Sequence, residues 1–253
     1  MKKEIPIINQ EGIEDDGIIH AENILKHPLP KHIQTALVIF DPRPSAKLLE
    51  KCSFLYDFVA GSSILPQYIF DNQIVLAFSP LGGPAAGGLI EELLAMGIQK
   101  VIACGSSGLI GDMDSSDFLI VEQAIRDEGL SYHYLPPSVY VDTDPDLSNL
   151  IKNHFNRLNI SYQEGITWTT DAFYKETKAK IALRKKQGAL AVEMECASMA
   201  AVCAFRQKSF AQVLYFSDIV HQDTWSGFRK DRQQVKEQIN QVMIDLAVYV
   251  NQQ

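Results

Sequence analysis

The sequence predicts a single α/β domain built on a mainly parallel β-sheet with helices on both faces. Short apolar runs rich in β-branched and aromatic residues alternate with longer segments of helical character. These runs lack the apolar–polar alternation of a half-exposed strand, so both faces of the sheet should be covered. No repeat, low-complexity tract or long linker divides the 253 residues. We therefore expect one domain over residues 1–253, with residues 1–35 as an irregular N-terminal extension.

The elements follow in order along the chain. Strands are expected at residues 36–40, 74–78, 101–104, 118–121 and 213–216. Helices are expected at residues 45–59, 85–96, 146–158, 175–186, 193–205 and 232–250. Pro28 and Pro30 interrupt any helix in the N-terminal extension. Gly97 is placed to cap the C-terminus of the helix expected at residues 85–96. The last helix has apolar residues every three to four positions, which predicts one face packed on the sheet.

The composition of the chain indicates which classes of binding partner and which cell compartment to expect. The chain has 23 Lys and Arg against 31 Asp and Glu, a net charge of -8, which argues against binding a nucleic-acid backbone. No apolar run approaches the roughly 20 residues that span a bilayer, and the start lacks the apolar core of a signal peptide. Because the four cysteines show no C-x-x-C spacing, we expect buried free thiols, a cytoplasmic location and no membrane association.

Two acidic motifs carry the expected chemistry. Glu193, Met194 and Glu195 stand in an apolar run, and Ser217 and Asp218 end a strand-like run. Carboxylates at the mouth of a parallel sheet are placed to bind a sugar diol and to move a proton. Together with the segments that follow, these motifs suggest an enzyme that cleaves the bond between ribose and a nucleobase. The structural alternatives are glutamates that stabilise a helix N-terminus and an aspartate that caps the next segment.

Two glycine-rich segments, residues 81–88 and 104–109, each follow an expected strand. Glycine lets a ligand approach the backbone, and exposed amides with serine hydroxyls can hold a phosphate or a sugar oxygen. Neither segment is a G-x-G-x-x-G or P-loop motif. Each can equally be a tight turn, although two such loops at neighbouring strand ends favour a ligand crevice.

The ordered set of motifs resembles the nucleoside phosphorylase and uridine phosphorylase superfamily, which includes purine nucleoside phosphorylases and methylthioadenosine nucleosidases. The segments that carry this resemblance are residues 82–84, 91–98, 105–108, 126–134, 170–174, 192–195 and 217–218. The resemblance implies a twisted mixed central sheet that curls into a partial barrel flanked by helices. It also implies a homo-oligomer, a dimer or a hexamer of dimers, in which a neighbouring subunit helps to complete each site.

The resemblance also implies site residues. Glu195 would hold the ribose hydroxyls over Met194, and His20 would reach a neighbour's ribose. Asp218 would protonate the leaving base, which favours a purine-like base. The implied base contacts are Phe173, Tyr174, Glu193 and Ser217. The implied phosphate contacts are Gly105, Ser106, Ser107 and Arg43.

The chain departs from the family pattern around phosphate. Phe40 stands where the family has a glycine, and Pro44 and Ala103 stand where it has arginines. Phosphate as acceptor would give free base and ribose 1-phosphate, the reaction of a pentosyltransferase, whereas water would give hydrolysis. We expect phosphorolysis with phosphate as co-substrate, with hydrolysis as the alternative. No other cofactor is expected, and the histidine spacing predicts no metal site.

Two further classes compete with the enzyme. A nucleoside-binding protein that lost catalysis would explain the altered phosphate residues. A dinucleotide-dependent oxidoreductase would share the α/β pattern, but the missing G-x-G-x-x-G after the first strand argues against it.

Overall fold

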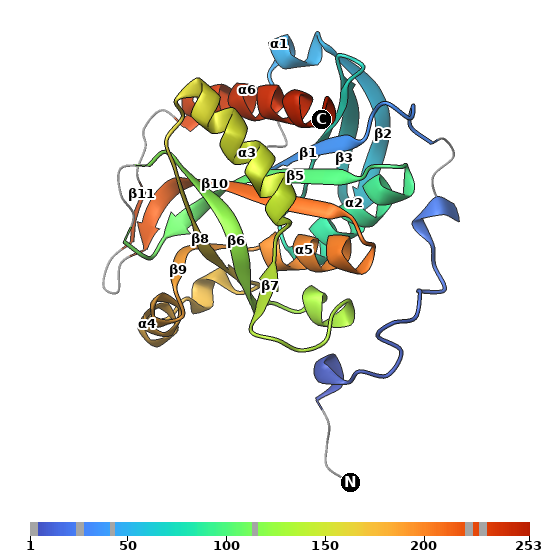
Figure 1. Ribbon diagram of the computed structural model, residues 1–253. Helices are drawn as coiled ribbons and strands as arrows, with labels where there is room; N and C mark the ends of the chain where they lie inside the picture. The colour runs from blue at the N-terminus through green and yellow to red at the C-terminus, as the bar shows by residue number, and fades with distance from the viewer. Residues whose placement is uncertain (1–4, 24–27, 41–43, 113–115, 221–224, 228–231) are drawn as a thin grey trace.

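The computed structural model describes residues 5–23, 28–40, 44–112, 116–220, 225–227 and 232–253, of which 217–220, 225–227 and 232–235 are described by their backbone alone. Within these residues an eleven-stranded mixed sheet is flanked by helices (Figure 1). The strands are β1 (Thr35–Ile39), β2 (Cys52–Ala60), β3 (Ser63–Phe70), β4 (Ile74–Phe78), β5 (Lys100–Leu109), β6 (Phe118–Asp127), β7 (Tyr140–Asp142), β8 (Tyr162–Thr170), β9 (Ala189–Glu193), β10 (Ser209–Val220) and β11 (Trp225–Gly227). The α-helices are α1 (Ala46–Leu49), α2 (Gly83–Ala95), α3 (Pro145–Leu158), α4 (Lys178–Lys186), α5 (Cys196–Phe205) and α6 (Arg232–Asn251). Short 3₁₀ turns lie at η1 (Pro6–Ile8), η2 (Ala21–Asn23), η3 (Leu130–His133) and η4 (Phe173–Lys175).

Five of the eleven strands form a closed barrel. Its strand order is β11-β10-β6-β8-β9-β5-β1-β4-β3-β2, and β10 pairs with β5 as well as with β6. Strands β5, β9, β8, β6 and β10 therefore form a closed ring of mixed direction. Strands β4, β1, β5 and β10 run parallel to one another, so their carboxyl ends meet at one edge. That edge is where α/β folds place ligands.

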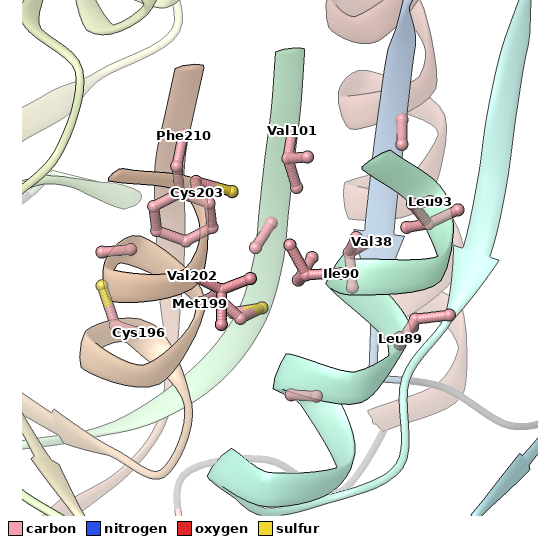
Figure 2. Packing of buried hydrophobic residues seen from close by; sticks show 14 of the residues in the cluster. Val38, Leu89, Ile90, Leu93, Val101, Cys196, Met199, Val202, Cys203 and Phe210 are labelled. Carbon is pink, nitrogen blue, oxygen red and sulfur yellow. The ribbon is translucent and has the colours of Figure 1, made fainter. Parts of the chain in front are cut away.

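Helices cover both faces of the parallel strands, as the sequence predicts. Helices α2 and α5 pack on one face, and Figure 2 shows Ile90 of α2 and Met199 of α5 directed toward the strands that carry Val38 and Val101. Helices α3 and α6 cover the opposite face, where they meet side chains such as Ile102. Successive strand residues point to opposite faces, so continuous apolar runs were needed to fill both layers.

The expected fold class is confirmed, with a closed barrel in place of the partial one. All five expected strands are present, and the helices expected at 85–96, 146–158 and 232–250 shift by a few residues at most. The helix expected at residues 45–59 is wrong. Only Ala46–Leu49 is helical, and the chain then enters β2.

Local chemistry explains that error. The Ser45 hydroxyl accepts the Leu48 N–H and caps the short helix. Beyond it, Phe54, Tyr56 and Phe58 recur every second residue, and aromatic side chains with that period favour a strand. Antiparallel pairing with β3 then fixes the segment as an edge hairpin.

The remaining differences lie at element ends and in short strands. The helix expected at 193–205 begins at Cys196, because Glu193 is the last residue of β9. The helix expected at 175–186 begins at Lys178, after a Thr177 cap. Strands β3, β7, β8, β9 and β11 were not expected. Residues 5–23 carry only the two 3₁₀ turns η1 and η2.

Candidate active site

The carboxyl ends of the four parallel strands bring the glycine-rich segments and the acidic motifs to one edge of the sheet. Phe40 directly follows β1, and Gly82 follows β4. The segment Gly105–Gly108 lies near the carboxyl end of β5. Asp218 lies near the end of β10. Residues from four separate stretches of the chain thus converge at the edge that the sequence indicated.

Gly108 of β5 pairs with both of the strands that carry the acidic motifs. On one side of β5 it pairs with Asp218 of β10, and on the other side it pairs with Val192 of β9. Strands two apart lie about 10 Å from each other, so a small ligand lying over the end of β5 would span the distance between these two segments. A β-bulge at Ser217 interrupts the β10 register just before Asp218, and bulges near active sites re-aim the chain. The side chains of Ser217 and Asp218 lie outside the described residues.

Glu195 lies between β9 and α5, three residues after Val192. Its side chain is buried, and its Oε1 accepts the Gly82 N–H at 2.7 Å. Gly82 has φ of +94°, a left-handed conformation that favours glycine. The first glycine-rich segment therefore ties the strand-to-helix turn after β4 to the expected ribose-binding carboxylate.

Glu193 is engaged by the protein itself. Its Oε2 accepts the N–H groups of Glu195 and Cys196 at 2.7 and 2.6 Å, and its Oε1 accepts the Thr169 hydroxyl at 2.6 Å. Thr169 Oγ1 in turn accepts the Ala197 N–H. The first free N–H groups of α5 are thereby satisfied. This is the helix-stabilising role that the sequence offered as an alternative, and base contact by Glu193 stays a prediction.

Both glutamates have raised pKa values. Burial, together with the neighbouring charge of Glu193, raises the pKa of Glu195 to about 8. Burial also raises the pKa of Glu193, while its hydrogen-bond donors act in the opposite direction. Carboxyl groups with raised pKa values at a strand edge are typical of functional sites.

Asp171 and Glu128 are acidic neighbours that the sequence reasoning did not single out. Asp171 accepts the Gly129 N–H at 2.8 Å, and its charge contributes to the raised pKa of Glu195. Glu128 accepts the Ser198 hydroxyl at 2.5 Å and raises the pKa of Glu193. Both belong to segments that carry the family resemblance, so position within those motifs was the available signal.

The expected phosphate-binding residues of β5 do not share one face of the strand. Ser106 is exposed whereas Ser107 is 4% exposed, because consecutive strand residues point to opposite faces. Ser107 Oγ has no hydrogen-bond partner among the described residues. Gly105 lies against the Phe40 ring, since a Cβ built on it would be 3.0 Å from Phe40 Cδ2. Arg43 lies outside the described residues.

The other expected contacts are exposed or half-buried. Phe173 and Tyr174 are 51% and 91% exposed, and their ring centroids are 4.1 Å apart. Both follow β8, whose Thr169 pairs with Glu193 in β9. Met194 is half-buried between the two buried glutamates, and His20 is half-buried directly before η2. No hydrogen bond joins the His20 side chain to another described residue of this chain.

Among the described residues, no group of three or more His, Cys, Asp or Glu side chains is arranged to hold a metal ion. All four cysteines are free, as expected; Cys104, Cys196 and Cys203 are buried, whereas Cys52 is only half-buried. No helix in the described part of the chain has the length and apolarity needed to cross a bilayer.

Comparison with known proteins identifies the family of the chain. A family profile described as "Phosphorylase superfamily" matches residues 35–249. The chain is 31% identical over 153 residues to an aminodeoxyfutalosine nucleosidase of Helicobacter pylori, covering 56% of this chain and 66% of that protein. It is 30% identical over 162 residues to a uridine phosphorylase of Haemophilus influenzae, covering 62% of this chain and 63% of that one.

A DeoD-type purine nucleoside phosphorylase of Mycoplasma pneumoniae is 28% identical over 146 residues, covering 54% of this chain and 60% of that protein. The chain thus spans about 60 to 66% of the length of these three relatives. The profile covers most of the chain, from the start of β1 into α6. The protein belongs to the phosphorylase superfamily.

Proposed function

We propose that this protein cleaves the N-glycosidic bond of a nucleoside with a purine-like base. One observation carries the proposal: Gly108 pairs with both Asp218 and Val192. This register brings the expected proton donor and the segment of the expected ribose-binding carboxylate to opposite sides of one strand end. A small ligand lying over this strand end would meet both groups at once.

Each group has a physical task in this reaction. Glu195, held by the Gly82 N–H, would accept hydrogen bonds from the ribose cis-diol. Asp218 would donate a proton to the base nitrogen as the bond to C1′ breaks, because a protonated base leaves more readily. Met194 would pack beneath the sugar. Phe173 and Tyr174 would stack on the base, and Ser217 and Glu193 would line the base side.

The acceptor separates two versions of the proposal. Phosphorolysis is the version that the sequence led us to expect, with Gly105, Ser106, Ser107 and Arg43 holding phosphate. Hydrolysis is the second candidate, and the contact between Phe40 and Gly105 favours it. The relatives carry both kinds of name, nucleosidase and phosphorylase.

A base-release assay tests the proposal directly. Purified protein is incubated with a panel of purine and pyrimidine nucleosides, with and without phosphate, and free base is quantified by chromatography. We expect release from at least one purine nucleoside. If nucleosides bind without turnover, the protein is an inactive nucleoside-binding member of the family. Absence of both binding and release across the panel contradicts the proposal.

A further inference from the structure

The Phe40 ring lies directly over the glycine-rich end of β5. Ile39 pairs with Cys104, so the next residue of the β1 chain reaches the level of Gly105. A Cβ built on Gly105 would lie 3.0 Å from Phe40 Cδ2 and 3.4 Å from Phe40 Cε2. The ring therefore covers the backbone at the place where a glycine would otherwise leave room for an anion.

The charges around this edge also oppose an anion. Glu193, Glu195, Glu128 and Asp171 are close enough to shift one another's pKa values. Those of the four that are ionised would repel a phosphate dianion, whereas water carries no charge.

The arginines whose side chains the structure describes offer no compensation. Each is bonded elsewhere: Arg126 to Ser131 and Ser138, Arg157 to His154, Arg184 to Asp127, and Arg206 to Glu91. Ala103, two residues before Gly105 on the same strand face, is fully buried in the core and supplies no charge.

The Ser107 hydroxyl is a polar group that can bind a neutral ligand near Gly105. Ser107 lies two residues beyond Gly105 and so shares its strand face. Its hydroxyl is buried and has no partner among the described residues. Buried hydroxyls normally form hydrogen bonds, so this one is available to a water molecule or to a hydroxyl of the substrate.

From these observations, and resting on the proposed function, we propose that Phe40 excludes phosphate and makes water the acceptor. The oxygen of water bonds to C1′, and the C1′–N bond breaks with its electron pair staying on the base. The proton that water loses balances the proton that the base gains. The products are free base and ribose, with no ribose 1-phosphate.

The test measures base release and sugar products in phosphate-free buffer and with millimolar inorganic phosphate. The inference predicts equal rates in both buffers and ribose as the only sugar. Base release that requires phosphate and yields ribose 1-phosphate overturns it. Absence of release in both buffers defeats the proposed function instead, so the two failures are distinguishable.

Two variants test the role of the ring itself. Phe40→Gly uncovers Gly105, and phosphate should then change the rate, as inhibitor or as acceptor. Phe40→Leu keeps a bulky apolar side chain at the same place, so its rate should stay indifferent to phosphate. Circular dichroism and thermal unfolding confirm that both variants fold. A folded Phe40→Gly protein that phosphate does not affect shows that the ring is not what excludes the anion.

Discussion

The two glutamates of the acidic motif look equivalent in the sequence but differ in their surroundings. Glu193 accepts three hydrogen bonds of 2.6 to 2.7 Å, two of them from backbone N–H groups, whereas the Glu195 side chain accepts the N–H of Gly82. Donors stabilise the ionised form. When the pair carries one negative charge, that charge therefore resides on Glu193, and Glu195 holds the proton.

This division gives a pH dependence of stability. The pKa of Glu195 is raised to about 8, so the folded state binds more protons than the unfolded state between the ordinary glutamate pKa of 4.5 and 8. The free energy of unfolding should therefore fall as the pH rises through that range. Urea denaturation at about pH 5 and about pH 8 should show a loss on the order of 3–4 kcal/mol, since one pKa unit corresponds to about 1.4 kcal/mol. Glu195→Gln should flatten the profile, and an equal slope in the variant would contradict the assignment.

The ribose contact predicts a second outcome for Glu195. Glu195→Ala removes the two proposed hydrogen bonds to the diol and should raise KM by roughly 10- to 100-fold, because each such bond contributes about 0.5–1.5 kcal/mol. A 2′-deoxynucleoside removes one of those hydroxyls from the substrate. The wild type should therefore discriminate against it more strongly than the variant does. Glu164→Ala, which alters an exposed ion pair with Lys152, is the matched control.

At the scale of elements, the first glycine-rich segment lets helix α2 pack closely against its neighbours. A Cβ on Gly83 would lie 2.2 Å from Ser198 Oγ, and one on Gly87 would lie 2.2 Å from Leu130 Cδ2. Helix α2 thus approaches α5 and η3 too closely for a side chain at these positions. The approach also brings Gly82 to Glu195 and so positions the site.

Neighbouring glycines of α2 provide a matched test. Gly87→Ala should destabilise the protein by about 1–3 kcal/mol, because the methyl group overpacks against Leu130. Gly88→Ala should stabilise it by about 0.5–1 kcal/mol, since alanine favours a helix and its Cβ would meet Phe58 at an ordinary 3.8 Å. Chemical denaturation measures both changes. Equal effects of the two substitutions would contradict this packing.

Elements that local pattern determines were predictable, and those set by distant partners were not. Apolar runs located β1, β4 and the core of β10, and helical period located α2, α3 and α6. Short strands such as β7 and β9 depend on pairing with β6, β5 and β8, which no local pattern reveals. For the same reason the sequence indicated Gly108 and Asp218 separately, but their pairing across β5 and β10 emerges only from the fold.

At the scale of the whole molecule, the family resemblance predicts a homo-oligomer. Strand β2 is the last strand of the sheet, and Phe54, Val59 and Ile64 of the β2–β3 hairpin are exposed. Apolar side chains on an edge hairpin are typical of an interface. We expect light scattering to give a multiple of the 28.3 kDa chain mass.

Substitution locates that interface. Ile64→Lys places a charge beside Val59, its cross-strand partner, and should weaken association. Val139→Lys changes an exposed apolar residue elsewhere and should leave the oligomer intact. A monomeric wild type at all concentrations would contradict the prediction. Association that resists Ile64→Lys would place the interface on another surface.

The central claim is that Glu195 and Asp218 act on one bound nucleoside, and the rate of purine release by Asp218→Asn tests it most directly. Asparagine keeps the size of the side chain but cannot act as the proton donor. The account predicts a fall in kcat of about 10²- to 10⁴-fold, with little change in KM, because ribose binding through Glu195 remains. Release at the wild-type rate by a folded Asp218→Asn protein would contradict it.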